Sequence, residues 1–164
     1  MNKVRDIVRI SLVAALYVAL TLLVYPYAYG EVQFRISEVL VLLCFYRKDY
    51  CYSLIIGCLL ANIFSTLGLL DIVFGTLATA IAVILIAYSK KLFVATLFPV
   101  IVNGLIVGSL IFYTTMEPIP IYLYMIYVAV GEAVVVSILG YIMFKMLGKN
   151  KLFLEVIEAN QNFK

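Results

Sequence analysis

Six apolar runs, separated by short polar segments, dominate the sequence. They lie near residues 7–27, 36–46, 51–68, 70–88, 92–113 and 121–147. A helix needs about 20 mostly apolar residues to cross the hydrocarbon core of a bilayer, which is roughly 30 Å thick. We therefore expect an all-α integral membrane protein in which residues 1–164 form a single transmembrane domain of six spans.

The second and the last run depart from the expected span length. As an α-helix, residues 36–46 would rise only about 16 Å, so this span has to borrow from the preceding loop or lie where the bilayer is thin. Non-helical backbone at membrane depth is tolerated only beside protein or a water-filled cavity. The run 121–147 exceeds the bilayer thickness, and we expect it to tilt or to project.

Composition and charge support a membrane protein and orient it. Hydrophobic residues make up 66% of the chain, charged residues only 13%, and the mean hydropathy is +1.14. Basic residues near spans stay cytoplasmic, and eleven of the 12 fall on one side of the predicted spans: Lys3, Arg5, Arg9, Arg47, Lys48, Lys90, Lys91, Lys145, Lys149, Lys151 and Lys164. Both termini are therefore predicted to be cytoplasmic, and the net charge of +3 reflects topology rather than a nucleic-acid surface.

Several kinds of chemistry are not expected. The sequence has no histidine, and Cys44, Cys51 and Cys58 lie in or beside apolar runs. We expect these cysteines to be small buried hydrophobic residues rather than disulfides or metal ligands. The absence of a nucleophile motif argues against an enzyme, and without a Walker A motif the chain alone does not hydrolyse ATP. We expect no cofactor.

The remaining polar residues gather on the opposite, outer side or within the spans. The candidates for ligand binding are Glu31, Gln33, Arg35, Glu38, Asn62, Asp71, Asn103 and Glu132. An ionisable group in hydrocarbon costs roughly 2.5–3.5 kcal/mol, so such groups tend to face a cavity, pair with one another or bind a ligand. Alternatives stay open at single positions. Arg35 can pair with either neighbouring glutamate of its loop, and Asp71 can be only an N-cap.

Small residues recur at helical spacing in two of the runs. Ala15 and Ala19 lie on one face of the first span, and Gly104 and Gly108 on one face of the fifth. Small residues four positions apart allow close helix approach. Since such pairs are frequent in apolar sequence, spacing alone favours internal packing for both.

Three blocks of sequence together resemble a known family. They are Gly30-Glu-Val-Gln-Phe-Arg-Ile-Ser-Glu38, Gly57-Cys-Leu-Leu-Ala-Asn62 and Asp71-Ile-Val-Phe-Gly-Thr-Leu-Ala-Thr79. Their order and spacing, the chain length and the six spans are similar to the QueT family, the S-components of energy-coupling factor transporters. The resemblance implies a bacterial plasma-membrane protein with an S-component-like bundle. It also implies uptake of a queuosine precursor, 7-aminomethyl-7-deazaguanine or a related 7-deazapurine.

The resemblance further implies partners. A transmembrane coupling subunit and two ATPase subunits would supply the energy, and the face of Ala15 and Ala19 would be the docking surface, which reverses the packing preference for this motif. The candidate residues fit the ligand, because carboxylates accept adjacent ring and amine donors and bind an ammonium group. An S-component for another vitamin-like molecule and a stand-alone proton-coupled carrier remain alternatives.

Overall fold

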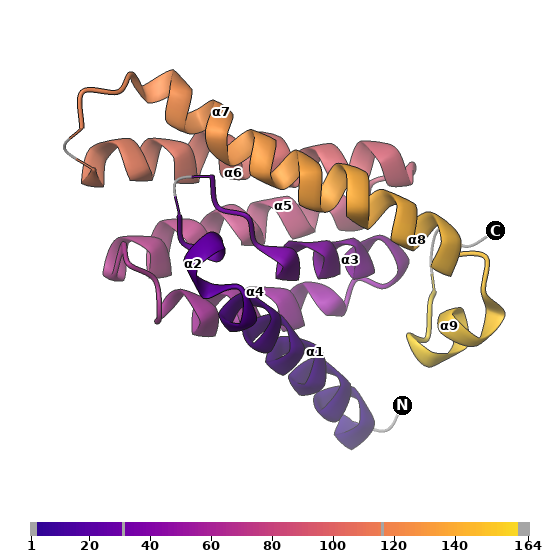
Figure 1. Ribbon diagram of the computed structural model, residues 1–164. Coiled ribbons are helices and arrows are strands. Elements are labelled where there is room, and N and C mark those ends of the chain that lie inside the picture. Colours follow the sequence, from indigo (N-terminus) through magenta and orange to yellow (C-terminus); the bar gives the residue numbers. More distant parts are fainter. Residues whose placement is uncertain (1–2, 31, 116, 161–164) are drawn as a thin grey trace.

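The computed structural model describes residues 3–30, 32–115 and 117–160, and within these residues every regular element is helical (Figure 1). In chain order the elements are α1 (Lys3–Leu23), α2 (Tyr25–Ala28), η1 (Ile36–Leu42), α3 (Leu43–Tyr46), α4 (Tyr50–Asn62), η2 (Asp71–Gly75), α5 (Thr76–Tyr88), α6 (Leu92–Thr114), α7 (Ile121–Glu132), η3 (Ala133–Gly140), α8 (Tyr141–Leu147) and α9 (Lys151–Val156). The predicted all-α class is confirmed.

Four helical stretches are long and apolar enough to cross a membrane. They are Val4–Leu23, Asp71–Tyr88, Leu92–Thr114 and Ile121–Leu147, and two shorter apolar helices, Ile36–Tyr46 and Tyr50–Asn62, accompany them. In the last stretch, η3 is a π-helical segment that joins α7 to α8 without a break. The described chain is thus a helical bundle with several membrane-crossing candidates.

The first predicted run, 7–27, is divided in the structure. α1 ends at Leu23, and the short helix α2 carries Pro26 in its first turn. A proline inside a helix lacks the N–H donor, and its ring clashes with the carbonyl four residues earlier, here that of Leu22. The helix therefore stops before Pro26 and restarts in a new direction.

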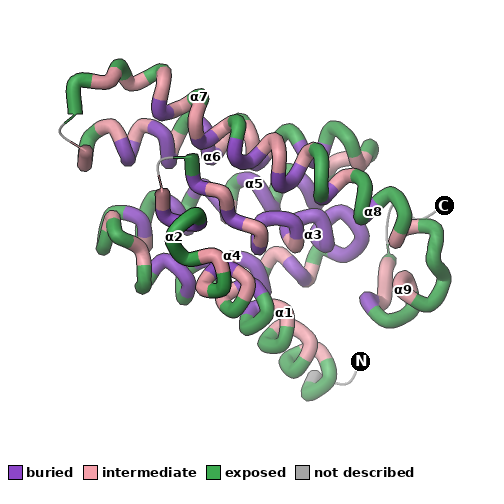
Figure 2. The backbone as a smooth tube through the Cα atoms, viewed as in Figure 1, coloured by how far each residue is buried: buried purple, intermediate pink, exposed green. Residues whose placement is uncertain are grey.

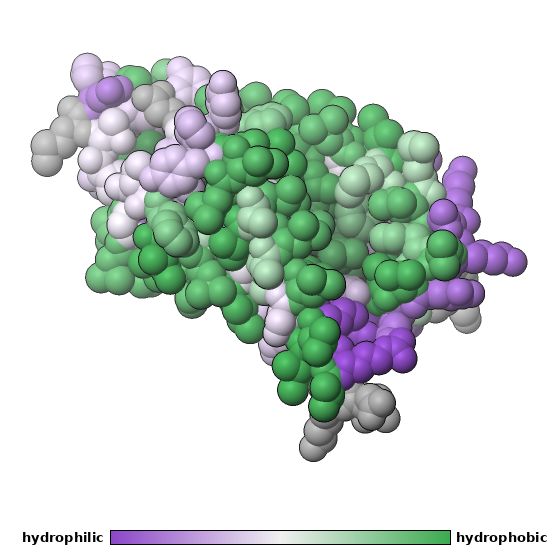
Figure 3. All heavy atoms as spheres, turned by 60° about the horizontal axis from the view of Figure 1, so that its bottom comes forward, coloured by the Kyte–Doolittle hydropathy of each residue, from purple (hydrophilic) through white to green (hydrophobic). Residues whose placement is uncertain are grey.

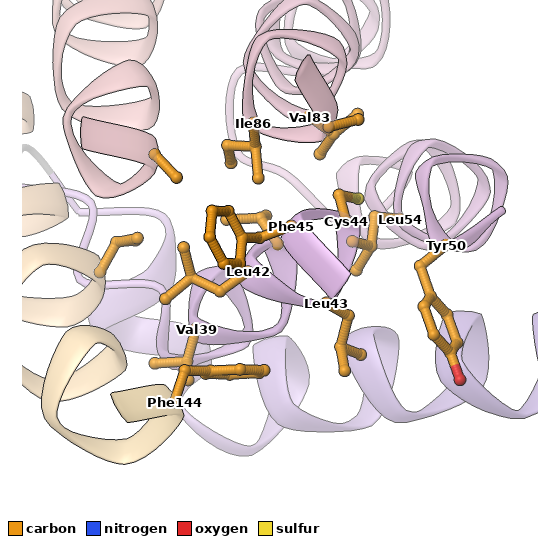
Figure 4. Packing of buried hydrophobic residues seen from close by; sticks show 14 of the residues in the cluster. Val39, Leu42, Leu43, Cys44, Phe45, Tyr50, Leu54, Val83, Ile86 and Phe144 are labelled. Atoms are coloured by element: carbon orange, nitrogen blue, oxygen red, sulfur yellow. The ribbon is translucent and has the colours of Figure 1, made fainter. Parts of the chain in front are cut away.

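The short apolar segment 36–46 lies at the centre of the bundle. Its first part, η1, is a 3₁₀ helix, which rises about 2.0 Å per residue and so spans more depth than an α-helix of equal length. Nearly all residues of the segment are buried (Figure 2). Val39, Leu42 and Phe45 pack among Ile86 and Phe144 of the surrounding helices (Figure 4). Because protein surrounds this segment, it does not have to be long enough to span the hydrocarbon core.

α6 and α7 form a closely packed antiparallel pair. A Cβ atom placed on Gly104 would lie 3.1 Å from the Cβ of Ala129, and one on Gly108 would lie 2.5 Å from the Cα of Met125. A side chain at position 108 would therefore push the two helices apart. The prediction that the Gly104–Gly108 motif serves internal packing is confirmed.

One end of the bundle carries both ends of the described chain (Figure 1), and hydrophilic residues gather there beside a broad apolar surface (Figure 3). Glu158 pairs with Arg5 and Arg9 of α1 and, at 2.8 Å, with Arg47, which also pairs with Asp49 at 2.8 Å. These guanidinium groups, Arg9 foremost, lower the pKa of the Glu158 carboxyl below its ordinary value. The cluster ties the C-terminal segment to α1.

Candidate functional site

Buried polar side chains gather where the segment 32–38 meets α4, η2, α6 and α7. Seven of the eight predicted residues are at most 4% exposed: Gln33, Arg35, Glu38, Asn62, Asp71, Asn103 and Glu132. Glu31, the eighth, lies outside the described residues. Five of the seven form two hydrogen-bonded clusters, Arg35 with Asn62 and Asp71, and Asn103 with Glu132, which differ in how their charges are paired.

The first cluster is centred on Arg35. Its Nε donates to the carbonyl oxygen of Ala28 at 3.1 Å, one terminal nitrogen donates to Asn62 Oδ1 at 3.0 Å, and the other lies 2.9 Å from Asp71 Oδ2. The guanidinium also lies 5.1 Å from the centre of the Tyr29 ring. Arg35 therefore holds the segment before η1 against α4 and η2.

Asn62 and Asp71 are fixed by further contacts. Asn62 Nδ2 donates to the backbone carbonyl of Asp71 at 3.0 Å and lies 3.4 Å from Thr76 Oγ1. A Cβ on Gly75 would overlap Asp71 Oδ1, so a larger residue there would displace the carboxylate. The interpretation of Asp71 as only an N-cap is wrong, because Asp71 is the first residue of η2 and its carboxylate pairs with Arg35.

Glu38 is held from α1. The Tyr17 hydroxyl donates to Glu38 Oε1, and the Oγ atoms of Thr21 and Ser37 lie 2.6 Å apart. A Cβ on Gly57 would lie 2.9 Å from the Cβ of Tyr17, so the missing side chain of Gly57 is what lets α1 come this close to α4. Sequence reasoning did not select Tyr17 or Thr21. Their spacing could have identified them, because two polar side chains four residues apart lie on one face of an otherwise apolar helix.

The second cluster joins α6 and α7. Asn103 Nδ2 donates to Glu132 Oε1 at 2.7 Å. The other two oxygens, Asn103 Oδ1 and Glu132 Oε2, are buried and accept no hydrogen bond from any described residue. Buried acceptors without a donor are costly, because they have lost their hydrogen bonds to water.

The loop before η1 lies against this second cluster. A Cβ on Gly131, next to Glu132, would overlap the carbonyl oxygen of Val32 and lie 3.3 Å from that of Gln33. Gln33 itself is buried and has a positive φ of 49°. The loop backbone therefore lies directly on α7 beside Glu132.

The charges of the two clusters differ. Asp71 also has an oxygen, Oδ1, without a donor, but its charge is cancelled by the ion pair with Arg35. Glu38 and Glu132 have no cationic partner within 4.0 Å among the described residues. Glu38 and Arg35 both lie close enough to Glu132 to interact electrostatically with its carboxyl group, although Arg35 forms its ion pair with Asp71. The site thus holds an excess of carboxyl groups and unused acceptors, which suits a ligand rich in hydrogen-bond donors.

Long apolar helices around a buried polar centre are typical of multi-pass membrane transport proteins. Residues 7–149 match the family model of the QueT transporter, and the chain belongs to the QueT transporter family. This confirms the resemblance found in the sequence. Membership in a transporter family also supports the prediction that the chain is not an enzyme.

A curated relative agrees with the family. Over 82 residues the chain is 40% identical to the queuosine precursor transporter QueT of Lactococcus lactis subsp. cremoris. The aligned part covers 49% of this chain and 48% of the relative, about half the length of each. No solved structure matches the chain.

Proposed function

We propose that the chain is the substrate-binding S-component of an energy-coupling factor importer in the bacterial plasma membrane. It has six spans, with both termini cytoplasmic, and captures 7-aminomethyl-7-deazaguanine or a related 7-deazapurine from outside. Family membership and the name of the relative, a queuosine precursor transporter, support the ligand class. The basic end that joins α1, the loop after α3 and the C-terminal segment supports the orientation.

The observation that carries the proposal is the pair of unused acceptors at Asn103 Oδ1 and Glu132 Oε2. A 7-deazaguanine ring presents a ring N–H and an exocyclic amine side by side, and these two donors match two acceptors on adjacent side chains. The aminomethyl group adds an ammonium, for which Glu38 is the second carboxylate. The ligand would supply the donors and the positive charge that the site lacks.

The Arg35 cluster has a supporting role in this proposal. Its charge is balanced by Asp71, so neither group needs a charged ligand. Arg35 and Asn62 instead fix the segment that leads into η1 and carries Gln33 over the site. The loop is thereby held ready to cover the ligand.

The outer face of α1 is the proposed docking surface for the coupling subunit. Ala15 and Ala19 are exposed, whereas Ala14, Tyr17 and Thr21 face the bundle. Only 17% of the helical stretch Val4–Leu23 is buried inside the bundle. Small side chains on an exposed membrane helix let a second helix approach closely. Two ATPase subunits bound to the coupling subunit would supply the energy.

Calorimetric titration of the purified chain in detergent tests the ligand. We expect selective binding of 7-aminomethyl-7-deazaguanine over guanine and riboflavin. Riboflavin binding would favour an S-component for another vitamin. Uptake that persists without ATP and partner subunits would favour a proton-coupled carrier.

A further inference from the structure

A cavity of about 400 Å³ lies at the basic end of the bundle and shares no lining residue with the acidic site. It is lined by Lys48 and Asp49 of the loop before α4, by Cys51, Tyr52 and Ile55 at the start of α4, and by Ile84, Ala87 and Tyr88 at the end of α5. None of these residues takes part in the site described above. The cavity therefore needs a separate explanation.

Its mouth carries the positive charge of Lys48. The carboxylate of Asp49 is already used, because it accepts a hydrogen bond from Arg47 at 2.9 Å. Lys48 has no carboxylate within 4.0 Å in the described part of the chain, and its Nζ lies 4.2 Å from the centre of the Tyr88 ring. This cation–π contact holds the ammonium group at the cavity while leaving its N–H donors available.

The walls of the cavity become more apolar with distance from Lys48. Tyr52 and Tyr88, at the mouth, are 65% and 72% exposed, as expected for tyrosines at the level of lipid head groups. Ile55 and Ile84 continue the cavity along the apolar surfaces of α4 and α5, and Ile84 is 48% exposed. A cationic mouth above an apolar wall fits an amphiphile with an anionic head.

We propose that this cavity binds an anionic phospholipid of the leaflet on the basic side of the protein. The phosphate lies against Lys48 and accepts hydrogen bonds from the hydroxyl groups of Tyr52 and Tyr88. One acyl chain follows Ile55 and Ile84. Charge complementarity selects this occupant, since a zwitterionic lipid brings a cation that Lys48 repels.

Native mass spectrometry of the purified chain with defined lipids tests the site. We expect phosphatidylglycerol to bind more tightly than phosphatidylcholine. Lys48→Gln lowers the phosphatidylglycerol affinity about fivefold, because a lysine near an anionic surface contributes about 1 kcal/mol, and Lys48→Arg keeps it.

The matched control is Lys145→Gln. Lys145 also stands over a tyrosine ring, 5.3 Å from the centre of Tyr141, but it does not line the cavity. We expect this variant to bind phosphatidylglycerol like the unaltered chain. Equal losses in Lys48→Gln and Lys145→Gln would mean diffuse surface attraction and would overturn the proposal.

The variant Ile84→Phe tests the contact with the acyl chain independently of the contact with the head group. It fills the apolar part of the cavity and leaves every charge in place, and the partly exposed position tolerates a larger side chain. We expect weaker phosphatidylglycerol binding in a variant that keeps the elution volume of the unaltered chain. Unchanged binding, or full competition by glycerol phosphate alone, would contradict a lipid site.

Discussion

The two buried polar clusters of the bundle resemble each other in composition but not in pairing. Around Arg35, a cation binds both an acid and an amide, and the two charges cancel. Between α6 and α7, an amide and an acid share one hydrogen bond and each keeps one unused oxygen, and no described cation lies within 4.0 Å of the acid. Similar residue types therefore stabilise the fold in one place and stay available for a ligand in the other.

The difference follows from the position of each cluster in the fold. Arg35 precedes η1 and reaches two elements that are neighbours through the turn between α4 and η2, so its charge is matched inside the chain. Asn103 and Glu132 lie on long helices, α6 and α7, that carry no basic side chain. Changes in the first cluster should mainly alter stability, and changes in the second should mainly alter binding.

The largest expected effect is that of Arg35→Met on stability. It leaves the Asp71 carboxylate buried without its cation, which costs about 3–5 kcal/mol, and thermal unfolding in detergent measures the loss. The control is the double variant Arg35→Met with Asp71→Asn, which removes both charges and should regain part of the stability. A double variant as unstable as the single one would contradict the pairing argument.

Glu132→Gln should lower ligand affinity and leave stability intact, the reverse of what we expect for Arg35→Met. It removes a buried carboxylate without a cationic partner, so the unfolding temperature should stay the same or rise. Ligand affinity should fall about tenfold or more, because a hydrogen bond to a charged group contributes about 1.5–3 kcal/mol. Calorimetric titration measures the affinity. Glu155→Gln, at an exposed position, is the control and should change neither quantity.

Tyr17→Phe should weaken binding less. It deletes the hydroxyl that orients Glu38 and keeps the ring packed against Gly57, so we expect a loss of about 1 kcal/mol, or roughly fivefold, in affinity. Tyr46→Phe is the matched control. It deletes a buried hydroxyl that donates to Phe144 at the other end of the bundle and should leave binding unchanged.

The ion cluster around Glu158 should give the smallest effect, and one that depends on pH. Because the pKa of Glu158 is lowered in the folded state, its stabilising contribution is present above its ordinary pKa of 4.5 and is lost as the pH falls through the folded-state pKa. Thermal unfolding at pH 7 and at about pH 4 measures this loss. Glu158→Gln should reduce the pH dependence, and an unaltered profile would contradict the role of the cluster.

The sequence was sufficient to predict the helical membrane class, because hydropathy and charge act through local composition. Its three blocks of residues were sufficient to identify the family. It was insufficient to predict which partner each acid has. Arg35 pairs with Asp71, 36 positions away, rather than with Glu38 in its own segment. Pairing of this kind depends on how helices pack. The burial of residues 36–46 likewise could not be predicted, since the length of a helix does not say what surrounds it.

The most direct test compares two ligands that differ in one charge. Calorimetric titration of the same purified chain would give the dissociation constants of 7-aminomethyl-7-deazaguanine and 7-cyano-7-deazaguanine, which share the ring donors but differ in the ammonium group. Because Glu38 and Glu132 lack a cationic partner among the residues that the structure describes, we expect the aminomethyl compound to bind at least about tenfold more tightly. Equal or tighter binding of the cyano compound would contradict the claim that the unpaired acids form the binding site.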